Sequence, residues 1–216
     1  MFFPLRDENP SDGQPIVTIS LIAVNVAIFI FCLALGEKGY GAIIYQFGMI
    51  PAQLTIYAPI TSMFLHGSFG HIIGNMWFLW IFGDNIESVC GRRKFIIFYI
   101  LSGLFAGLLH FLLYPASNIP TIGASGAIAG ILGAYIVLYP RAKILTLIWF
   151  FVITTARISA VWFLGFWFVM QLFYGSIGVI AAVSTGVAYW AHIGGFLAGA
   201  GLILILRKHK PRNAII

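Results

Sequence analysis

The 216-residue chain is 61% hydrophobic and only 8% charged, with a mean hydropathy of +0.99. A soluble core does not need so much apolar sequence, so the composition predicts a single-bundle integral membrane protein that crosses the membrane several times. The net charge of +6 lies in short basic clusters between apolar runs, which favours loops beside anionic lipid and excludes nucleic acid as a partner.

The apolar runs predict six spanning helices, most of them near the roughly 20 residues that a bilayer requires. These helices are expected at residues 16–35, 69–89, 95–114, 125–139, 158–174 and 187–206. Pro115 ends the third run and Pro140 closes the fourth, because proline cannot continue a helix. The predicted fold class is therefore all-α integral membrane.

Two apolar segments do not fit a simple span. Residues 36–59 are too apolar for a free linker and too interrupted by glycine and proline for a helix that crosses, so we expect a long interfacial connection between helices 1 and 2. Residues 144–155 precede Arg157, which is costly at bilayer depth. For them we expect an interfacial or membrane-dipping segment.

The basic residues predict the sidedness of the bundle. Six spans place Arg92, Arg93, Lys94, Arg141, Lys143 and the sequence after residue 206 on one side, which the positive-inside rule makes cytoplasmic. A seventh span at residues 144–156 would move the basic tail outside. We therefore expect a cytoplasmic segment at 1–15, without a cleavable signal peptide, a membrane domain at 16–206 and a basic cytoplasmic tail at 207–216.

Ser125 begins the fourth predicted span within a run of small residues, Gly-Ala-Ser-Gly from residue 123. Such a helix start leaves backbone N–H groups free beside the hydroxyl, which suits a nucleophile, although small residues are also the ordinary packing surface of membrane helices. Residues 125–139 cover only about 22 Å, against about 30 Å of hydrocarbon. We therefore expect Ser125 to lie in a water-accessible recess below the outer surface.

A serine nucleophile needs a base, and His192 lies at a similar depth near the start of the sixth span. Gly195 and Gly199 follow it on one helix face, and two further glycines, at 126 and 130, follow the serine. Small-residue faces allow close helix packing, which would bring the hydroxyl and the imidazole within hydrogen-bond distance. A histidine that only bonds a backbone carbonyl is the alternative interpretation.

An oxyanion hole is predicted from the second span. His71 and Asn75 are four residues apart on one helical face at its outward end, and together with the Ser125 backbone N–H they can bind a developing oxyanion. A helix-to-helix polar bond is the alternative for Asn75. Because no Asp or Glu remains on that side to orient His192, the residues favour a Ser-His dyad over a triad.

Three segments carry a resemblance to a known family. Residues 66–75 (HGSFGHIIGN), 123–126 (GASG) and 191–195 (AHIGG) resemble, in order, the signature segments of the rhomboid intramembrane serine proteases. The similarity runs over residues 16–206. It includes an element at the cytoplasmic side that resembles the family's structural Glu and Gly-Arg positions: Gly83, Glu87, Gly91 and Arg92.

The resemblance implies an intramembrane serine endopeptidase of the six-helix prokaryotic type, with no cofactor and no metal. It makes Ser125 the nucleophile, His192 the general base, and His71, Asn75 and the Ser125 amide the oxyanion hole. It places gating elements in residues 36–59 and in the fifth span. Ala129 is a departure, since the family often has an aromatic residue four positions after the serine, near the histidine.

The resemblance also implies transmembrane protein substrates and a prokaryotic plasma membrane, with the site opening to the outer side. Two other functions stay open: a catalytically inactive relative that binds membrane proteins, and a transporter that uses His66, His71 and His192 for protons or metal. The transporter predicts inverted repeats and intramembrane acidic residues, which the sequence does not show. Cys32 and Cys90 are expected to be buried, inert thiols.

Overall fold

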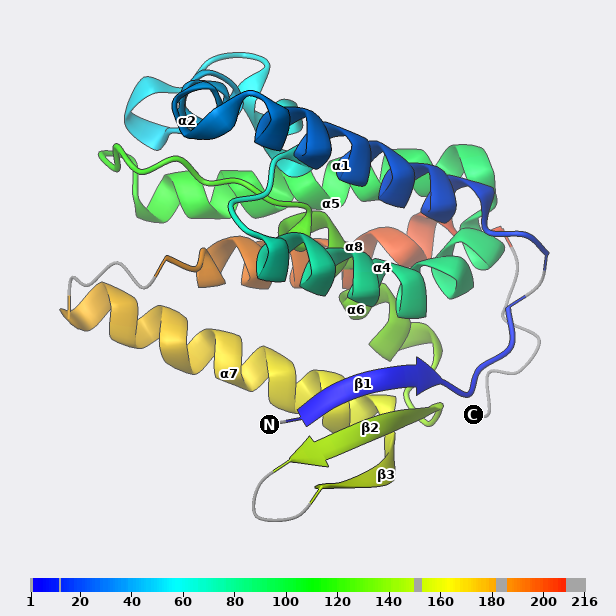
Figure 1. Cartoon of the computed structure of the whole chain (residues 1–216). Coiled ribbons are helices and arrows are strands. Elements are labelled where there is room, and N and C mark those ends of the chain that lie inside the picture. The colour runs from blue at the N-terminus through cyan, green and yellow to red at the C-terminus, as the bar shows by residue number, and fades with distance from the viewer. Residues whose placement is uncertain (1, 12, 150–152, 182–185, 209–216) are drawn as a thin grey trace.

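The computed structural model describes residues 2–11, 13–149, 153–181 and 186–208. Figure 1 shows a bundle of long helices with a small sheet at one end. The long helices are α1 (Ile16–Ala34), α4 (Phe69–Cys90), α5 (Arg92–Leu113), α6 (Ser125–Leu138), α7 (Ala160–Ala181) and α8 (Tyr189–Leu206). Four of them are long and apolar enough to cross a membrane: α1, α5, α7 over Ala160–Val179, and α8. The shorter α6 is also apolar.

The connection between α1 and α4 contains several short helices. It comprises α2 (Gly36–Phe47), the 3-10 helix η1 (Pro51–Gln53), α3 (Ala58–Thr61) and the 3-10 helix η2 (Ser62–Phe64). No residue of α2 is fully buried, and Tyr45 is 64% exposed. The glycine and proline residues thus divide this region into short pieces that lie over the ends of the longer helices (Figure 1).

Helix α6 lies at the centre of the bundle, and nearly all of its residues are buried. Two glycines of α8 face its backbone: a Cβ atom at Gly195 would collide with the carbonyl of Gly126, and a Cβ atom at Gly199 with that of Gly130. The predicted close packing of the two glycine faces is therefore confirmed. Because the backbones are in contact, the starts of α6 and α8 are held side by side.

The structure also contains a three-stranded antiparallel sheet, in the order β1 (Phe2–Asp7), β2 (Lys143–Trp149), β3 (Ile153–Ser159). Phe3 pairs with Leu147, and Leu145 pairs with Arg157. The expected all-α fold is thus wrong here, because residues 144–149 and 153–155 belong to the strands β2 and β3. Along β2 the fully buried Ile144 and Thr146 alternate with the more exposed Leu145 and Leu147, and β-branched residues suit a pleated strand.

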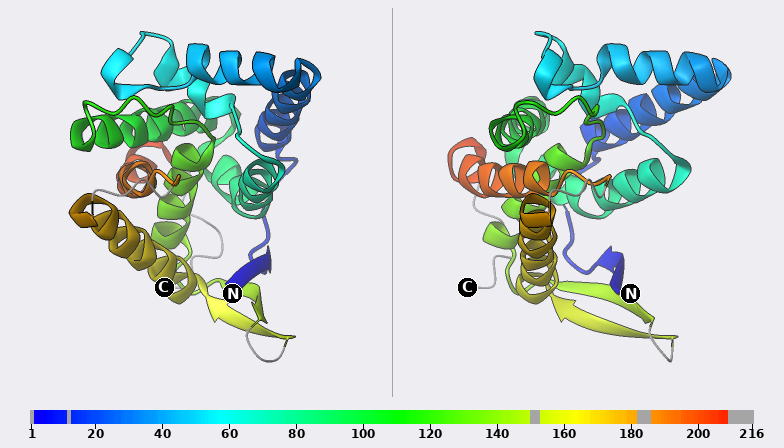
Figure 2. Two further views of the ribbon diagram at one scale, coloured as in Figure 1. Left: turned by 60° about the vertical axis from the view of Figure 1, so that its left-hand side comes forward. Right: turned by 90° about the vertical axis from the view of Figure 1, so that its left-hand side faces the viewer.

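The sheet lies against the helices at the end where α7 begins, as Figures 1 and 2 show. The Asp7 carboxylate at the end of β1 accepts hydrogen bonds from the Tyr135 hydroxyl on α6 (2.8 Å) and from the Asn85 amide on α4 (2.9 Å). Burial raises the pKa of Asp7 to about 6, the Tyr135 hydrogen bond partly offsets this rise, and the charge of Asp84 adds to it. The amino-terminal strand is therefore fastened to two helices through one carboxylate.

Glu87 fixes α1 to α4 at the same end of the bundle. Its side chain is 4% exposed and accepts hydrogen bonds from the backbone N–H groups of Val17 (2.9 Å) and Thr18 (2.8 Å). It also accepts one from the Thr18 hydroxyl (2.8 Å). Pro15, the residue before α1, supplies no side-chain cap. The acidic side chain of α4 thus satisfies the free N–H groups at the start of α1 and complements the helix dipole.

Candidate active site

Three helices, α4, α6 and α8, begin at the end of the bundle opposite the sheet, and each contributes a residue near its start. Ser125 is the first residue of α6, His71 lies in the first turn of α4 and His192 in the first turn of α8. The Ser68 hydroxyl caps α4 by accepting a hydrogen bond from the His71 backbone N–H (3.1 Å). These local helix starts aim polar groups at a common region.

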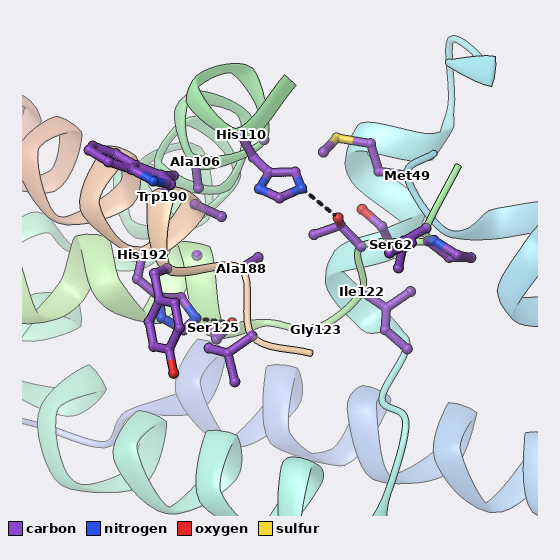
Figure 3. A pocket seen from close by; sticks show the side chains of 18 of the residues that line it. Met49, Ser62, Ala106, His110, Ile122, Gly123, Ser125, Ala188, Trp190 and His192 are labelled. Atoms are coloured by element: carbon purple, nitrogen blue, oxygen red, sulfur yellow. Dashed lines mark hydrogen bonds between the residues drawn. The ribbon is translucent and has the colours of Figure 1, made fainter. Parts of the chain in front are cut away.

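Ser125 and His192 are in direct contact. The distance between Ser125 Oγ and His192 Nε2 is 2.8 Å, which is a hydrogen bond, and Figure 3 shows it as a dashed line. Both residues are only partly buried. The pair thus has the nucleophile-and-base geometry that activates a serine hydroxyl.

The other side of the His192 ring is held by α7. Its Nδ1 lies 2.9 Å from the side-chain oxygen Oε1 of Gln171, which is 8% exposed. The Trp167 ring lies over the imidazole with a centroid distance of 6.0 Å and an angle of 33°. Ala129, the position at which the resemblance suggested an aromatic residue, is a core residue that is 1% exposed. Residues of α7 therefore provide the contacts that orient His192.

Gln171 is the site residue that sequence reasoning missed. A carboxylate was the expected kind of partner for His192, but an amide oxygen also accepts a hydrogen bond. The available signal was an amide isolated in an otherwise apolar span. The Trp167 contact has no such signal, because that span contains several other bulky aromatic residues.

His71 lies next to the serine loop, which is the segment over residues 121–124 immediately before Ser125. The Gly67 backbone N–H points to His71 Nδ1 at 3.4 Å, which leaves Nε2 as the protonated nitrogen of the ring. A Cβ atom at Gly123 would lie 2.6 Å from His71 Nε2, and Gly123 has a φ of +120°. Glycine at this position therefore lets the loop before Ser125 pass close to an imidazole N–H donor.

Asn75 is placed differently from its predicted neighbours. Its side-chain amide donates to the His71 carbonyl within α4 (2.9 Å), and the residue is 7% exposed. It does not line the cavity that contains the other site residues. The described structure thus brings Ser125, His192 and His71 together, and leaves the Asn75 amide bonded inside its own helix.

A cavity of about 1070 Å³ opens beside Ser125, His192 and His71. Figure 3 shows it between the serine loop, α5 and the start of α8. Its far wall includes His110, whose Nε2 lies 3.0 Å from the Thr121 hydroxyl, and Met49 from the connection before α3. This volume is large enough for several residues of an extended peptide and is lined by both polar and apolar groups.

His66, in the loop before α4, lies behind the site. Its ring packs edge-on against the His71 ring, with a centroid distance of 5.1 Å, and the residue is 1% exposed. Burial lowers the pKa of His66 to about 4, and the neighbouring His71 adds to this shift. At neutral pH the His66 ring is uncharged, as suits a packing residue rather than a base.

Comparison with known proteins identifies the same region. A family model described as "Rhomboid domain" matches residues 53–209. The chain is 33% identical over 139 residues to the presenilin-associated rhomboid-like protein, mitochondrial, of Bos taurus, covering 63% of this chain and 36% of that protein. It is 35% identical over 136 residues to rhomboid protein 1, mitochondrial, of Saccharomyces cerevisiae, covering 58% and 37%.

A longer match is to rhomboid-like protein 11, chloroplastic, of Arabidopsis thaliana, with 27% identity over 196 residues that cover 87% of this chain and 64% of that protein. The chain spans about a third of the length of the mitochondrial relatives. These relatives are organellar, so the expected placement in a prokaryotic plasma membrane is wrong. That placement was implied by the resemblance to the prokaryotic type of the family, and the charge pattern only orients a bundle within a membrane without identifying the membrane.

Proposed function

This chain belongs to the rhomboid family, whose members are generally intramembrane proteases, and from that premise we propose that it is a serine endopeptidase acting on membrane-protein substrates. Its substrates would be cleaved in or near their transmembrane segments. The observation that carries the proposal is the 2.8 Å contact between Ser125 Oγ and His192 Nε2 beside a large cavity. A serine with a partnered imidazole at a helix start is suited to acyl transfer.

In the proposed reaction, His192 Nε2 takes the hydroxyl proton as Ser125 Oγ attacks the scissile carbonyl carbon. The tetrahedral intermediate collapses to an acyl-enzyme when His192 returns the proton to the leaving amine and the C–N bond breaks. Water then attacks the acyl carbon with His192 again as base, which releases the new carboxylate and restores the serine hydroxyl.

The developing oxyanion would be bound by the Ser125 backbone N–H and by His71. The backbone N–H of Ser125 is at the first position of α6, where it has no intrahelical partner. The Nε2–H group of the neutral His71 ring lies close to Gly123, two residues before Ser125. Asn75 would contribute if its amide turns from the His71 carbonyl toward the cavity. Otherwise it supports His71 by fixing the first turn of α4.

We also propose that all six long helices cross the bilayer within a membrane domain at residues 16–206, with residues 1–15 and the tail from 207 outside it. Helix α4 is long enough, and α6 covers about 21 Å, which would sink Ser125 below the surface of about 30 Å of hydrocarbon. The connection over residues 36–59 would lie in the interface. The cavity would admit water, since buried backbone at that depth needs hydrogen-bond partners.

The sidedness follows from the positions of the basic residues. Arg92, at the start of α5, and Lys143, at the start of β2, lie at the end of the bundle opposite the site, where the Lys208 backbone N–H donates to the Val89 carbonyl (2.9 Å). The site would therefore face the side of the membrane away from the basic loops.

The test is labelling of the detergent-solubilised protein with a fluorophosphonate, which reacts with activated serines. The native chain should be labelled, and Ser125→Ala and His192→Ala should lose labelling. Ser117→Ala is the matched control, because Ser117 lines the same cavity and should retain the native rate. Labelling that persists in Ser125→Ala, or a native chain that is not labelled, would overturn the proposal.

An inactive binding protein of the same family is the alternative function. This function would be supported by a folded chain that binds membrane helices without cleaving them. The hydrogen bond between Ser125 and His192 favours the protease, since binding alone does not require a serine hydroxyl paired with an imidazole base.

A further inference from the structure

Gln171 lies where a triad enzyme has its third member. Its side-chain oxygen is 2.9 Å from His192 Nδ1, while Ser125 Oγ is 2.8 Å from His192 Nε2. The three side chains come from three different helices, α7, α8 and α6. They form one continuous hydrogen-bonded chain from the apolar helix α7 to the hydroxyl.

The chemistry of the amide oxygen determines the state of the imidazole. Gln171 Oε1 can only accept a hydrogen bond, so His192 Nδ1 must donate, and the neutral ring then has its lone pair on Nε2. That lone pair is what must accept the Ser125 proton. The opposite tautomer would present an N–H to the hydroxyl and would block general-base catalysis.

We propose that Gln171 is a positioning residue that holds His192 in the Nδ1–H tautomer. Through this contact, the fraction of His192 in the tautomer that can act as a base depends on the packing of α7 against α8. This inference rests on the proposed function for its catalytic consequence. Apart from the Ser125 hydroxyl, the contacts of the His192 ring described above come from Gln171 and Trp167 of α7.

Contacts on both sides of Gln171 along the chain hold α7 against α8. Before Gln171, the Trp167 ring contacts both His192 and Phe196, with centroid distances of 6.0 and 6.1 Å. After Gln171, the Gly175 carbonyl accepts a hydrogen bond from the Trp190 indole N–H (3.1 Å). A shift of α7 away from α8 would therefore break the Gln171 contact together with these, and would release His192 from its tautomer.

The experiment compares Gln171→Met, Gln171→Glu and the control Leu172→Met in the full-length chain. Methionine keeps the length of the side chain and removes the strong acceptor, glutamate keeps an acceptor, and Leu172 is a neighbouring α7 residue that is 36% exposed. Two readouts are taken: the rate of fluorophosphonate labelling across pH, and the tautomer of His192 from ¹⁵N-histidine NMR.

We expect Gln171→Met to label about tenfold more slowly, as for the loss of one hydrogen bond, and to lose the Nδ1–H tautomer as the dominant form. Gln171→Glu should restore labelling to within about threefold of native, with the acidic limb of its pH profile at higher pH, because a carboxylate stabilises a protonated ring. Leu172→Met should match native in both readouts. A purely structural role for Gln171 would lower the yield of folded protein and leave the tautomer and the pH profile unchanged.

The two readouts separate the two proposals. If Gln171→Met keeps the native labelling rate and the native NMR pattern, the positioning role is overturned while the protease proposal stands. If the native chain is not labelled but Gln171→Met still changes the tautomer, the positioning of His192 by Gln171 is supported and the protease proposal is overturned.

Discussion

Gly199 on α8 packs directly against the backbone of Gly130 on α6. The approach is so close that a Cβ atom on Gly199 would overlap the Gly130 backbone, and the same holds one turn nearer the site for Gly195 and Gly126. Ser125 and His192 lie just beyond these contacts. The glycine pairs thus set the separation of the two helices that carry the nucleophile and the base.

Gly199→Ala should disrupt this packing. The added methyl group meets backbone rather than a flexible side chain, so the helices must separate, at a cost of about 3 kcal/mol in the free energy of unfolding. Gly201→Ala is the matched control, because Gly201 is exposed on the same helix with open space around its Cβ position. Thermal unfolding in detergent measures both, and equal stability of the two variants would contradict the packing argument.

Gly123→Ala should impair the site with little effect elsewhere. Alanine strains the positive φ of +120°, and its methyl group would lie 2.6 Å from His71 Nε2, which displaces a proposed oxyanion donor. We expect fluorophosphonate labelling of Ser125 to slow about 100-fold. Gly74→Ala, in α4 with open space around it, serves as the control. A native rate in Gly123→Ala would show that His71 does not act through this contact.

Asp7→Asn should make the chain relatively more stable as the pH rises. The pKa of Asp7 is raised from 3.8 to about 6 in the folded chain, so the folded state retains a proton that the unfolded state loses between about pH 4 and 6. Native stability contributed by the protonated form is therefore present below pH 4 and lost as the pH rises through 6. The gap between native and Asp7→Asn should grow over that range by up to about 3 kcal/mol.

Melting temperatures of the two proteins at pH 4, 5, 6 and 7 measure this gap. Glu8→Gln is the control, because it removes a neighbouring carboxylate that forms an ion pair with the exposed Arg157 (2.8 Å). Its gap from native should not follow the same curve. A pH-independent difference for Asp7→Asn would show that this carboxylate is already ionised at pH 4.

Glu87→Ala should loosen α1 from the bundle. The change removes the acceptor for two backbone N–H groups and the Thr18 hydroxyl, which are left buried without that partner, and we expect a loss of about 3 kcal/mol in unfolding free energy. Glu87→Gln keeps one acceptor oxygen and should lose less. Glu37→Gln, on an exposed residue at the start of α2, should leave the melting temperature unchanged.

The sequence predicted the parts of this structure that depend on local pattern. Apolar runs located five of the long helices to within about three residues, whereas α7 continues to Ala181, beyond the predicted end at residue 174. Paired glycines located the contact of α6 with α8. Asn75 lies on the expected face of α4, yet its amide is satisfied by the carbonyl one turn earlier, an alternative that helical spacing alone cannot separate from a role in the cavity.

The sheet and the Gln171 contact were not predicted, for three physical reasons. The alternation of burial along residues 143–147 is hidden because most of these residues and their neighbours in the sequence are apolar, so the burial of Ile144 cannot be told from that of a helix residue. The partner strand, β1, lies more than a hundred residues away along the chain, beyond any local signal. Gln171 reaches His192 only through the tertiary packing of α7 on α8.

The pairing of β1 with β2 sets an order of events during synthesis. Residues 2–7 are made well before their partner at 143–149, which follows α1, α4, α5 and α6 along the chain. Strand β1 must therefore remain unpaired while these helices are inserted, and its pairing with β2 is a late step of assembly. A nascent chain halted before residue 143 would have the helices from α1 to α6, without the described sheet and without α7 and α8.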